Sequence, residues 1–327
     1  MTKARAPATF GVIGCGTIGG NVARQAIDRG YRVVTHDIGG VPADILASGA
    51  AEAVNLDQLA SEVKRPRIVF LFIPAGPAVD DVLEGLAAVF DPGDIVIDGG
   101  NSYWGDSRRR HERLAADGLA FVDLGTSGGA AGARRGACFM AGCEPDVFAS
   151  IAPILTDLAV KGGVIHAGPP GAGHFVKLVH NGIEFGMLQA IAEGVGLLNR
   201  FYDNDADTVG AVLEGWRHGS VIRSWLLDLM AEGFNREHGL EKVSAHVEDT
   251  GEVNWLVSDA MNMEVPVPIT AQAVMTLLQS RAGDRDYEKA IALMRHGFGD
   301  HPIGPEPAIA RHRHQSRVGP PMGPEPW

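Results

Sequence analysis

The chain has 327 residues and a formal net charge of −12, a length that suits about two domains. The acidic balance, without a long basic stripe, excludes nucleic acid as an expected partner. No apolar run reaches membrane-spanning length, and no signal-peptide segment opens the chain. Cys15, Cys138 and Cys143 lack the spacing of a metal site and indicate reduced thiols. We therefore expect a cytoplasmic protein that binds no metal and no membrane.

A β-α-β pattern near the start of the chain predicts a dinucleotide-binding domain. A short apolar strand at 10–13 leads into a glycine-rich loop, and a helical stretch follows at 21–30. The glycines allow a tight turn and let a pyrophosphate approach the backbone, while the helix N-terminus offers N–H groups to the phosphates. The expected cofactor-binding residues of this loop are Gly14, Gly16, Thr17, Ile18 and Gly19.

Asp37 ends the second predicted strand, 31–37, and determines the expected cofactor. A carboxylate at this point can accept hydrogen bonds from both ribose hydroxyls and repels a 2′-phosphate. Ile38 follows, so no arginine stands there to neutralise such a phosphate. The sequence therefore favours NAD over NADP. The alternative is that Asp37 only caps a turn.

Three further predicted strands, within 67–76, 94–102 and 121–129, end in loops suited to ligand binding. Ligands of such sheets gather at the carboxyl ends of the strands. A serine hydroxyl beside bare glycine amides is a candidate cradle for a carboxylate, although a Gly-Gly pair can also be a simple turn. The candidate residues of these loops are Ile73, Pro74, Ala75, Asn101, Ser127, Gly128 and Gly129.

The segment 173–189 predicts an apolar helix that carries one narrow polar stripe. The stripe residues follow each other at i, i+3, i+4 and i+7, so they share one face. Apolar neighbours predict that the helix is buried on most sides, and buried polar groups need partners that a polar substrate can supply. The alternative is an exposed strip on an ordinary amphipathic helix. The stripe consists of Lys177, His180, Asn181 and Glu184.

Long helical patterns replace strands after Gly173, at 178–200, 221–234, 269–281 and 287–299. The expected fold is an α/β Rossmann domain followed by an all-α domain. The expected bounds are 1–174 for the NAD-binding domain and 175–301 for the substrate and dimerisation domain. A tail rich in Pro, His and Arg occupies 302–327, and its proline content argues against a helix.

These motifs resemble the 6-phosphogluconate dehydrogenases, specifically their short, NAD-using, decarboxylating bacterial branch. The resemblance runs from the glycine loop to about His301 and rests on IDGGNS around Asn101, GTSGGAAGARRG around Ser127, GAGHFVKLVHNGIEFG around Lys177 and GSVIRSWLLD around Arg223. It implies an enzyme that oxidises the 3-hydroxyl of a sugar acid and then releases carbon dioxide.

The resemblance also implies residue roles. Lys177 would act as general base and Glu184 would protonate the enediol carbon. The substrate would contact Asn101, Ser127, Gly128, Gly129, His180, Asn181 and Asn254. The family pattern R-x-x-F-G-x-H, here Arg295, Phe298, Gly299 and His301, would come from the partner subunit of a homodimer.

The chain departs from the family where the C6 phosphate binds. The motif G-x-G-(Lys/Arg)-Trp-Thr has Asn254 at its cationic position and Leu256 at its threonine. Phe185 replaces a tyrosine, and Leu277 stands where an arginine is expected. A phosphate monoester carries about −1.5 to −2 charges near neutrality and needs several cations. These changes favour another C6 group, such as the sulfonate of 6-deoxy-6-sulfogluconate, or a neutral hydroxyl as in gluconate.

Three alternatives remain open. The first is a 6-phosphogluconate dehydrogenase proper whose phosphate site is rebuilt from Arg281 and tail residues such as Arg311 or Arg313. The second is a non-decarboxylating 3-hydroxyacid dehydrogenase, against which the HNGIE segment with Glu184 argues. The third is an NAD-binding sensor, which has no need of both Lys177 and Glu184.

Overall fold

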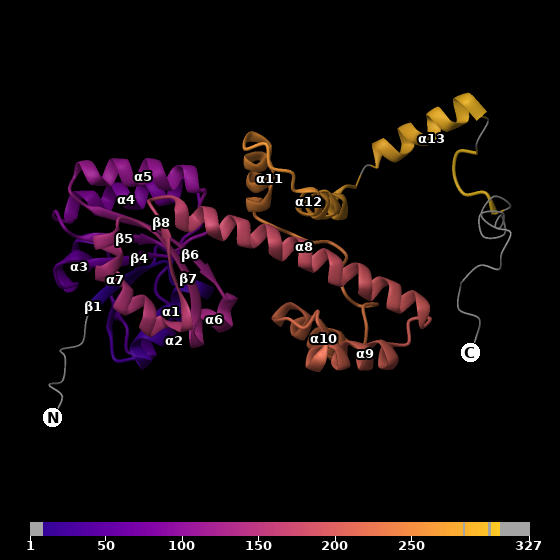
Figure 1. Ribbon diagram of the computed structural model, residues 1–327. Helices are drawn as coiled ribbons and strands as arrows, with labels where there is room; N and C mark the ends of the chain where they lie inside the picture. The colour runs from indigo at the N-terminus through magenta and orange to yellow at the C-terminus, as the bar shows by residue number, and fades with distance from the viewer. Residues whose placement is uncertain (1–8, 284, 300–301, 308–327) are drawn as a thin grey trace. The chain divides into compact units, whose positions relative to one another are not determined.

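The computed structural model describes residues 9–283, 285–299 and 302–307, and it divides into two compact units that meet between Asn181 and Gly182. That boundary lies inside one long helix, α8 (Ala172–Phe201) (Figure 1). The first unit is an α/β sandwich and the second is helical, which confirms the fold class expected from the sequence. Among the described residues, no helix is both long and apolar enough to cross a bilayer.

A single eight-stranded sheet forms the centre of the first unit, in the order β3-β2-β1-β4-β5-β6-β7-β8. The pairing is parallel everywhere except between β6 and β7. The chain order reverses between β1 and β4, so a crevice for a nucleotide is expected at their carboxyl ends. The strands are β1 (Thr9–Ile13), β2 (Arg32–His36), β3 (Ala51–Glu52), β4 (Ile68–Leu71), β5 (Ile95–Asp98), β6 (Ala120–Ser127), β7 (Ala137–Gly142) and β8 (Ala159–Gly168).

Helices cover both faces of this sheet, and each face has its own apolar core. One core includes Phe10, Val22 and Leu155, and the other includes Val69, Leu83 and Leu114. Helix α1 contacts both α6 and α7, while α4 contacts both α3 and α5 (Figure 1). Their bounds are α1 (Thr17–Asp28), α2 (Ala43–Ala47), α3 (Leu56–Glu62), α4 (Pro77–Val89), α5 (Trp104–Ala116), α6 (Gly129–Arg135) and α7 (Pro145–Leu158).

The sheet extends beyond the strands that the sequence predicted. The five expected strands are present: β1 begins one residue earlier than expected, and the other four are shorter than or shifted from their expected segments. Strands β3, β7 and β8 were not expected, and the last two continue the sheet past β6. Because Ser127 of β6 pairs with Cys138 of β7, this extension holds the Ser127 end of β6 in a regular ladder. Pairing of this kind depends on distant residues and leaves a weak local signal.

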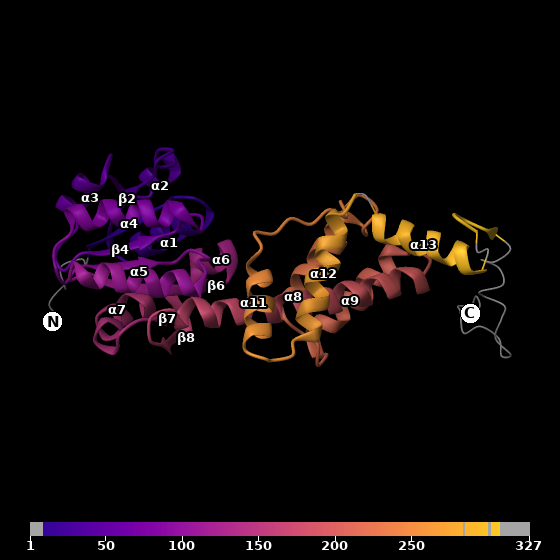
Figure 2. The ribbon, with the colours of Figure 1, turned by 90° about the horizontal axis from the view of Figure 1, so that it is seen from above.

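The second unit consists of helices with a small core of its own. Val195 of α8, Leu213 and Phe234 are members of this core. Helix α9 packs on α10 (Figure 1), and α11 lies beside α12 (Figure 2). The bounds are α9 (Ala206–Gly219), α10 (Trp225–Glu237), α11 (Glu252–Asn262), α12 (Pro268–Arg281) and α13 (Asp286–Gly299).

Burial of α8 differs from the expectation. The sequence predicted a helix buried on most sides, but the side chains of Ile183 and Leu197 are 60% and 73% exposed. Val179 and Met187 are also exposed. The described residues therefore leave an apolar face of α8 uncovered, since the helices of the second unit pack on only part of it.

Candidate active site

The glycine loop after β1 has the geometry that a phosphate-binding turn requires. Gly14 has a φ of +88°, and a Cβ there would lie 2.4 Å from the carbonyl oxygen of Phe72. A Cβ on Gly19 would lie 2.0 Å from the carbonyl oxygen of Gly14, so neither position accepts a side chain. Around Gly16, by contrast, a Cβ would meet nothing within 4 Å. The loop is therefore closely packed at Gly14 and Gly19 and open to solvent or a ligand at Gly16.

The start of α1 leaves this open side available to an anion. Gly16 caps the helix without a side-chain hydrogen bond, and the first turn, which begins at Thr17 and Ile18, carries no acidic residue. The unpaired N–H groups and the positive end of the helix dipole therefore face the open space. Burial raises the pKa of the Cys15 thiol to about 12, so it stays protonated and adds no charge to the loop.

Asp37 lies just beyond β2 and supports the glycine loop directly. Its Oδ2 accepts a hydrogen bond from Cys15 N at 2.7 Å, and its Oδ1 accepts one from Gly39 N at 2.8 Å. The turn-capping alternative is therefore present in the structure. Each carboxylate oxygen retains a second lone pair for a ribose hydroxyl, so capping and ribose binding are compatible. Ile38 beside it is fully exposed and offers no cation.

The loops after β4 and β5 contact each other at the carboxyl edge of the sheet. A Cβ on Gly100 would lie 2.9 Å from the carbonyl oxygen of Ile73, so these loops pass closely only because residue 100 is glycine. Asp98 shapes the second loop by accepting from Gly100 N at 3.1 Å and from Ser102 Oγ at 2.7 Å. The Ile73–Pro74–Ala75 loop and Asn101 are thus held side by side.

Five predicted residues form one hydrogen-bonded chain at the beginning of α8. Lys177 Nζ lies 3.4 Å from His180 Nδ1, and His180 Nε2 lies 2.9 Å from Ser127 Oγ. His180 Nδ1 also lies 3.3 Å from Asn181 Oδ1. Asn181, which is 7% exposed, donates from Nδ2 to Asn101 Oδ1 at 3.4 Å. Residues from β6, α8 and the β5 loop therefore converge within the first unit.

Gly128 and Gly129 adjoin this cluster in conformations that favour glycine. Their φ angles are +122° and +57°, and they lie at the start of the short helix α6. Gly125, on β6, was not singled out by the sequence. A Cβ there would lie 2.5 Å from Lys177 Cβ, so the glycine provides the space in which the lysine stem lies.

A buried carboxylate that the sequence did not single out holds the beginning of α8. Asp123 is fully buried and accepts from Gly171 N at 2.6 Å and from His174 N at 2.8 Å. These N–H groups belong to the first turn of the helix, which lacks intrahelical partners for them. Burial raises the pKa of Asp123. The local signal, one Asp within an apolar strand, was available but has no unique meaning.

The remaining predicted residues belong to the second unit or lie outside the described residues. Glu184 lies on α8 about 10 Å along the axis from Lys177. Asn254 is an exposed residue of α11, and Arg295 is an exposed residue of α13. His301 lies outside the described residues, as do Arg311 and Arg313.

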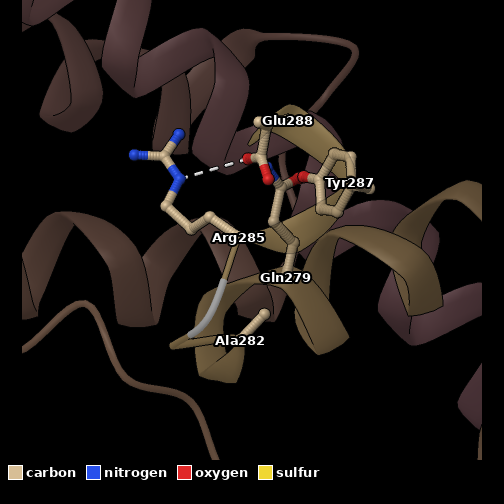
Figure 3. Close-up of a pocket in the computed structure, with 5 residues that line it drawn as sticks. All are labelled: Gln279, Ala282, Arg285, Tyr287 and Glu288. Carbon is tan, nitrogen blue, oxygen red and sulfur yellow. Dashed lines mark hydrogen bonds and ion pairs between the residues drawn. The ribbon is translucent and has the colours of Figure 1, made fainter. Parts of the chain in front are cut away.

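Two other kinds of site, a metal cluster and a ligand pocket, find little support among the described residues. No cluster of three or more His, Cys, Asp or Glu side chains suited to a metal occurs among them. The residues drawn in Figure 3 line a hollow whose volume is about 240 Å³, smaller than the roughly 300–1,000 Å³ of typical ligand pockets. No predicted site residue lines it, and the ion pair between Arg285 and Glu288 crosses its wall.

Fold and site together define a dinucleotide-dependent dehydrogenase. The open space at Gly16, the start of α1 without a side-chain cap and the carboxylate of Asp37 are compatible with the binding of a dinucleotide such as NAD. The Lys177 cluster lies at the carboxyl side of the same sheet, where a substrate is expected.

Comparison with known proteins identifies the family. Residues 9–168 match the NAD binding domain of 6-phosphogluconate dehydrogenase, and residues 173–300 match its C-terminal domain. The chain therefore belongs to the 6-phosphogluconate dehydrogenase family and is an NAD-dependent dehydrogenase. This confirms the family, the fold class and the cofactor that the sequence predicted.

Individual relatives resemble most of the chain. It is 39% identical to the YqeC protein of Bacillus subtilis, over 89% of this chain and 98% of the relative. It is 38% identical to the NAD(+)-dependent, decarboxylating 6-phosphogluconate dehydrogenase of Haloferax volcanii, over 90% and 98%. Among solved structures, the 6-phosphogluconate dehydrogenase of Plasmodium falciparum matches with a TM-score of 0.77 and 25% identity, over 92% of this chain and 67% of that one.

Proposed function

We propose that this protein oxidises and decarboxylates a 3-hydroxy sugar acid related to 6-phosphogluconate, with a C6 group other than phosphate. The hydrogen-bonded chain from Ser127 through His180 to Lys177 is the observation that carries the first part of the proposal. It presents an amine, an imidazole and a hydroxyl together, beside the amides of Asn181 and Asn101. Such a set can bind a polyol carboxylate and move one proton.

Lys177 is the proposed acid–base residue. NAD, when bound, supplies the acceptor for the hydride from C3. Neutral Lys177 takes the proton of the 3-hydroxyl, and its ammonium then donates a hydrogen bond to the 3-keto oxygen. The C1–C2 bond breaks, carbon dioxide leaves, and the electron pair moves toward that oxygen, which takes the proton back from Lys177 to give an enediol. Lys177 removes this proton again as the enediol becomes the keto product. Glu184 delivers a proton to the carbon that lost the carboxylate.

Substrate contacts follow from the same arrangement. Ser127 Oγ and the backbone amides of Gly128 and Gly129 can bind the carboxylate, because both glycines carry no Cβ to block an anion. Asn101, His180 and Asn181 can bind the hydroxyls. Arg295 and His301 are proposed, from the family pattern, to reach the site of a partner subunit.

The second unit supports the proposal of a C6 group other than phosphate. Leu256 is 8% exposed and packs on α8, where its Cδ2 would lie 2.3 Å from a Cβ on Gly182. Arg281 donates to Asp249 Oδ2 at 2.7 Å and to Val247 O at 3.1 Å. An arginine already neutralised by a carboxylate is a poor ligand for a doubly charged phosphate. A sulfonate, as in 6-deoxy-6-sulfogluconate, carries a single negative charge and therefore needs fewer cationic ligands.

The decisive experiment compares kcat/KM with NAD for 6-deoxy-6-sulfogluconate, 6-phosphogluconate and gluconate, and measures carbon dioxide alongside NADH. We expect equal amounts of both products and a preference for the sulfonate. A clear preference for the phosphate would establish the alternative favoured by the names of the relatives, a 6-phosphogluconate dehydrogenase proper. NADH without carbon dioxide would indicate a non-decarboxylating 3-hydroxyacid dehydrogenase, and failure to turn over any of them would favour the sensor.

We also propose that the protein forms a homodimer. Several large apolar side chains of the second unit are exposed, including Ile183, Leu197, Met261 and Ile269, and exposed apolar patches on a protein often mark an interaction surface. Light scattering after size-exclusion chromatography should give twice the mass of the chain. Leu197→Asp should shift the protein toward monomer, whereas Val54→Asp, at an exposed apolar position of the first unit, should leave the mass unchanged.

A further inference from the structure

Arg110 is a buried arginine with no part in the chemistry described so far. It lies on α5 and is 1% exposed. Its Nε donates to Asp80 Oδ1 at 3.0 Å, and its Nη2 donates to the carbonyl oxygen of Gly76 at 3.0 Å. Its Nη1 lies 3.6 Å from Asp98 Oδ2. One planar guanidinium therefore contacts the start of α4, the loop after β4 and the end of β5.

Two of these contacts, to Gly76 and to Asp98, lie at loops that carry predicted cofactor-binding residues. Gly76 directly follows the Ile73–Pro74–Ala75 segment and has a φ of +112°. Asp98 holds the backbone of the next loop through Gly100 N and Ser102 Oγ, on either side of Asn101. The same loops contact each other at Gly100 and Ile73. Arg110 is thus positioned to fix the spacing between them.

The connection extends to the helix that carries Lys177. The carbonyl oxygen of Asp98 lies 3.1 Å from His174 Nε2, and a carbonyl only accepts, so the ring donates from that nitrogen. His174 Nδ1 is in turn 2.7 Å from Ser107 Oγ. His174 lies one turn before Lys177 on α8. A displacement of Asp98 would therefore shift both the cofactor loops and α8, the helix that carries Lys177.

We propose that Arg110 is a positioning residue that holds the loops 73–76 and 99–102 in the arrangement that binds NAD. The inference rests on the proposed function only in requiring that NAD binds at these loops, and it is independent of the sugar acid. A guanidinium suits the task because its donors form a rigid planar fork. A lysine at this place offers one point charge and cannot reach Gly76, Asp80 and Asp98 together.

Arg109 provides a matched control within the same helix. It also pairs with Asp80, through Nη1 at 3.2 Å and Nη2 at 3.1 Å, but its side chain is 54% exposed. Its hydrogen bonds and ion pairs go to Asp80 and Asp106 and not to Gly76 or Asp98. Arg109→Lys therefore changes one contact to Asp80, the carboxylate that both arginines share. It leaves the contacts of Arg110 to both loops intact.

The test titrates the full-length protein with NADH by fluorescence, without sugar acid, and records Tm for each variant. Arg110→Lys should raise the Kd for NADH on the order of tenfold at a temperature where the variant is folded. Arg109→Lys should leave that Kd within about twofold of the wild type. In turnover, Arg110→Lys should raise KM for NAD and lower kcat, because the network also reaches His174, one turn before Lys177 on α8.

Each outcome decides the proposal. A folded Arg110→Lys variant with the wild-type Kd overturns it, as does an Arg109→Lys variant that loses as much affinity. If Arg110→Lys does not fold, Arg110→Gln repeats the test, since its shorter, uncharged amide cannot contact Gly76, Asp80 and Asp98 together. Failure of both variants to fold assigns Arg110 to stability and overturns the positioning role. Failure of the wild type to bind NADH would instead contradict the proposed function.

Discussion

Lys177 Nζ lies 3.4 Å from His180 Nδ1, one turn further along α8. The same nitrogen of His180 lies 3.3 Å from Asn181 Oδ1. An ammonium only donates and an amide oxygen only accepts, so Nδ1 accepts when Lys177 is protonated and can donate to Asn181 when it is not. Ser127 Oγ, at His180 Nε2, can take the complementary role in both states. The proton of the neutral imidazole can therefore change from one ring nitrogen to the other when Lys177 gains or loses its own proton.

Replacement of the proposed base tests this arrangement directly. Lys177→Met keeps the apolar stem and removes the amine. We expect kcat to fall on the order of 10³ to 10⁴-fold, with the Kd for NADH unchanged. The measurements are steady-state turnover and NADH titration. Turnover close to the wild-type rate with intact cofactor binding would show that another group takes the proton.

His180→Gln should weaken catalysis less than loss of the lysine. The amide can still contact Ser127, but it cannot exchange a proton between two nitrogens. We expect kcat to fall on the order of 10²-fold, with the Kd for NADH unchanged. Ser127→Ala, which leaves the imidazole in place, is the comparison. A wild-type kcat in His180→Gln would separate His180 from the proton-transfer step.

Two glycines of the cofactor loop should respond differently to alanine. At Gly16 a Cβ meets no protein atom and φ is −69°, so Gly16→Ala should preserve Tm and raise the Kd for NADH about tenfold or more. At Gly14 the φ of +88° and the contact with Phe72 O predict loss of stability instead. Gly14→Ala should lower Tm by roughly 5 °C or more. Calorimetry and NADH titration check both. Equal affinity of Gly16→Ala and wild type would place the pyrophosphate elsewhere.

Asp80 should make stability depend on acid pH. Hydrogen bonding to the Arg110 guanidinium, with a further contribution from Arg109, lowers the pKa of Asp80 from 3.8 to about 2. The folded state therefore binds fewer protons than the unfolded state, so this stabilisation is complete above the unfolded pKa and is lost as the pH falls toward the folded one.

Urea unfolding from about pH 5 down to about pH 2.5 measures this effect. The difference in free energy of unfolding between wild type and Asp80→Asn should shrink as the pH falls. Asp81→Asn, at the exposed neighbouring position, should follow the wild type at every pH. A difference for Asp80→Asn that stays constant over this range contradicts the assigned pKa.

Local patterns were sufficient for the elements that carry most of the candidate site and for the class of protein. The glycine spacing at Gly14 to Gly19, the acidic residue Asp37 and the polar stripe on α8 each lie within a short stretch of chain. Backbone conformation and helical periodicity act over such stretches, which is why the sequence alone identified the nucleotide domain and the family.

The tertiary structure decided which distant groups meet. Asn101 and Asn181 are 80 residues apart, and Arg110 reaches Asp80 and Asp98 across three elements. Strands β7 and β8, the buried support of α8 by Asp123 and the exposed apolar face around Ile183 were likewise not foreseen. Strand order and helix docking bring such partners together, and no periodicity within a single element encodes a contact to another element.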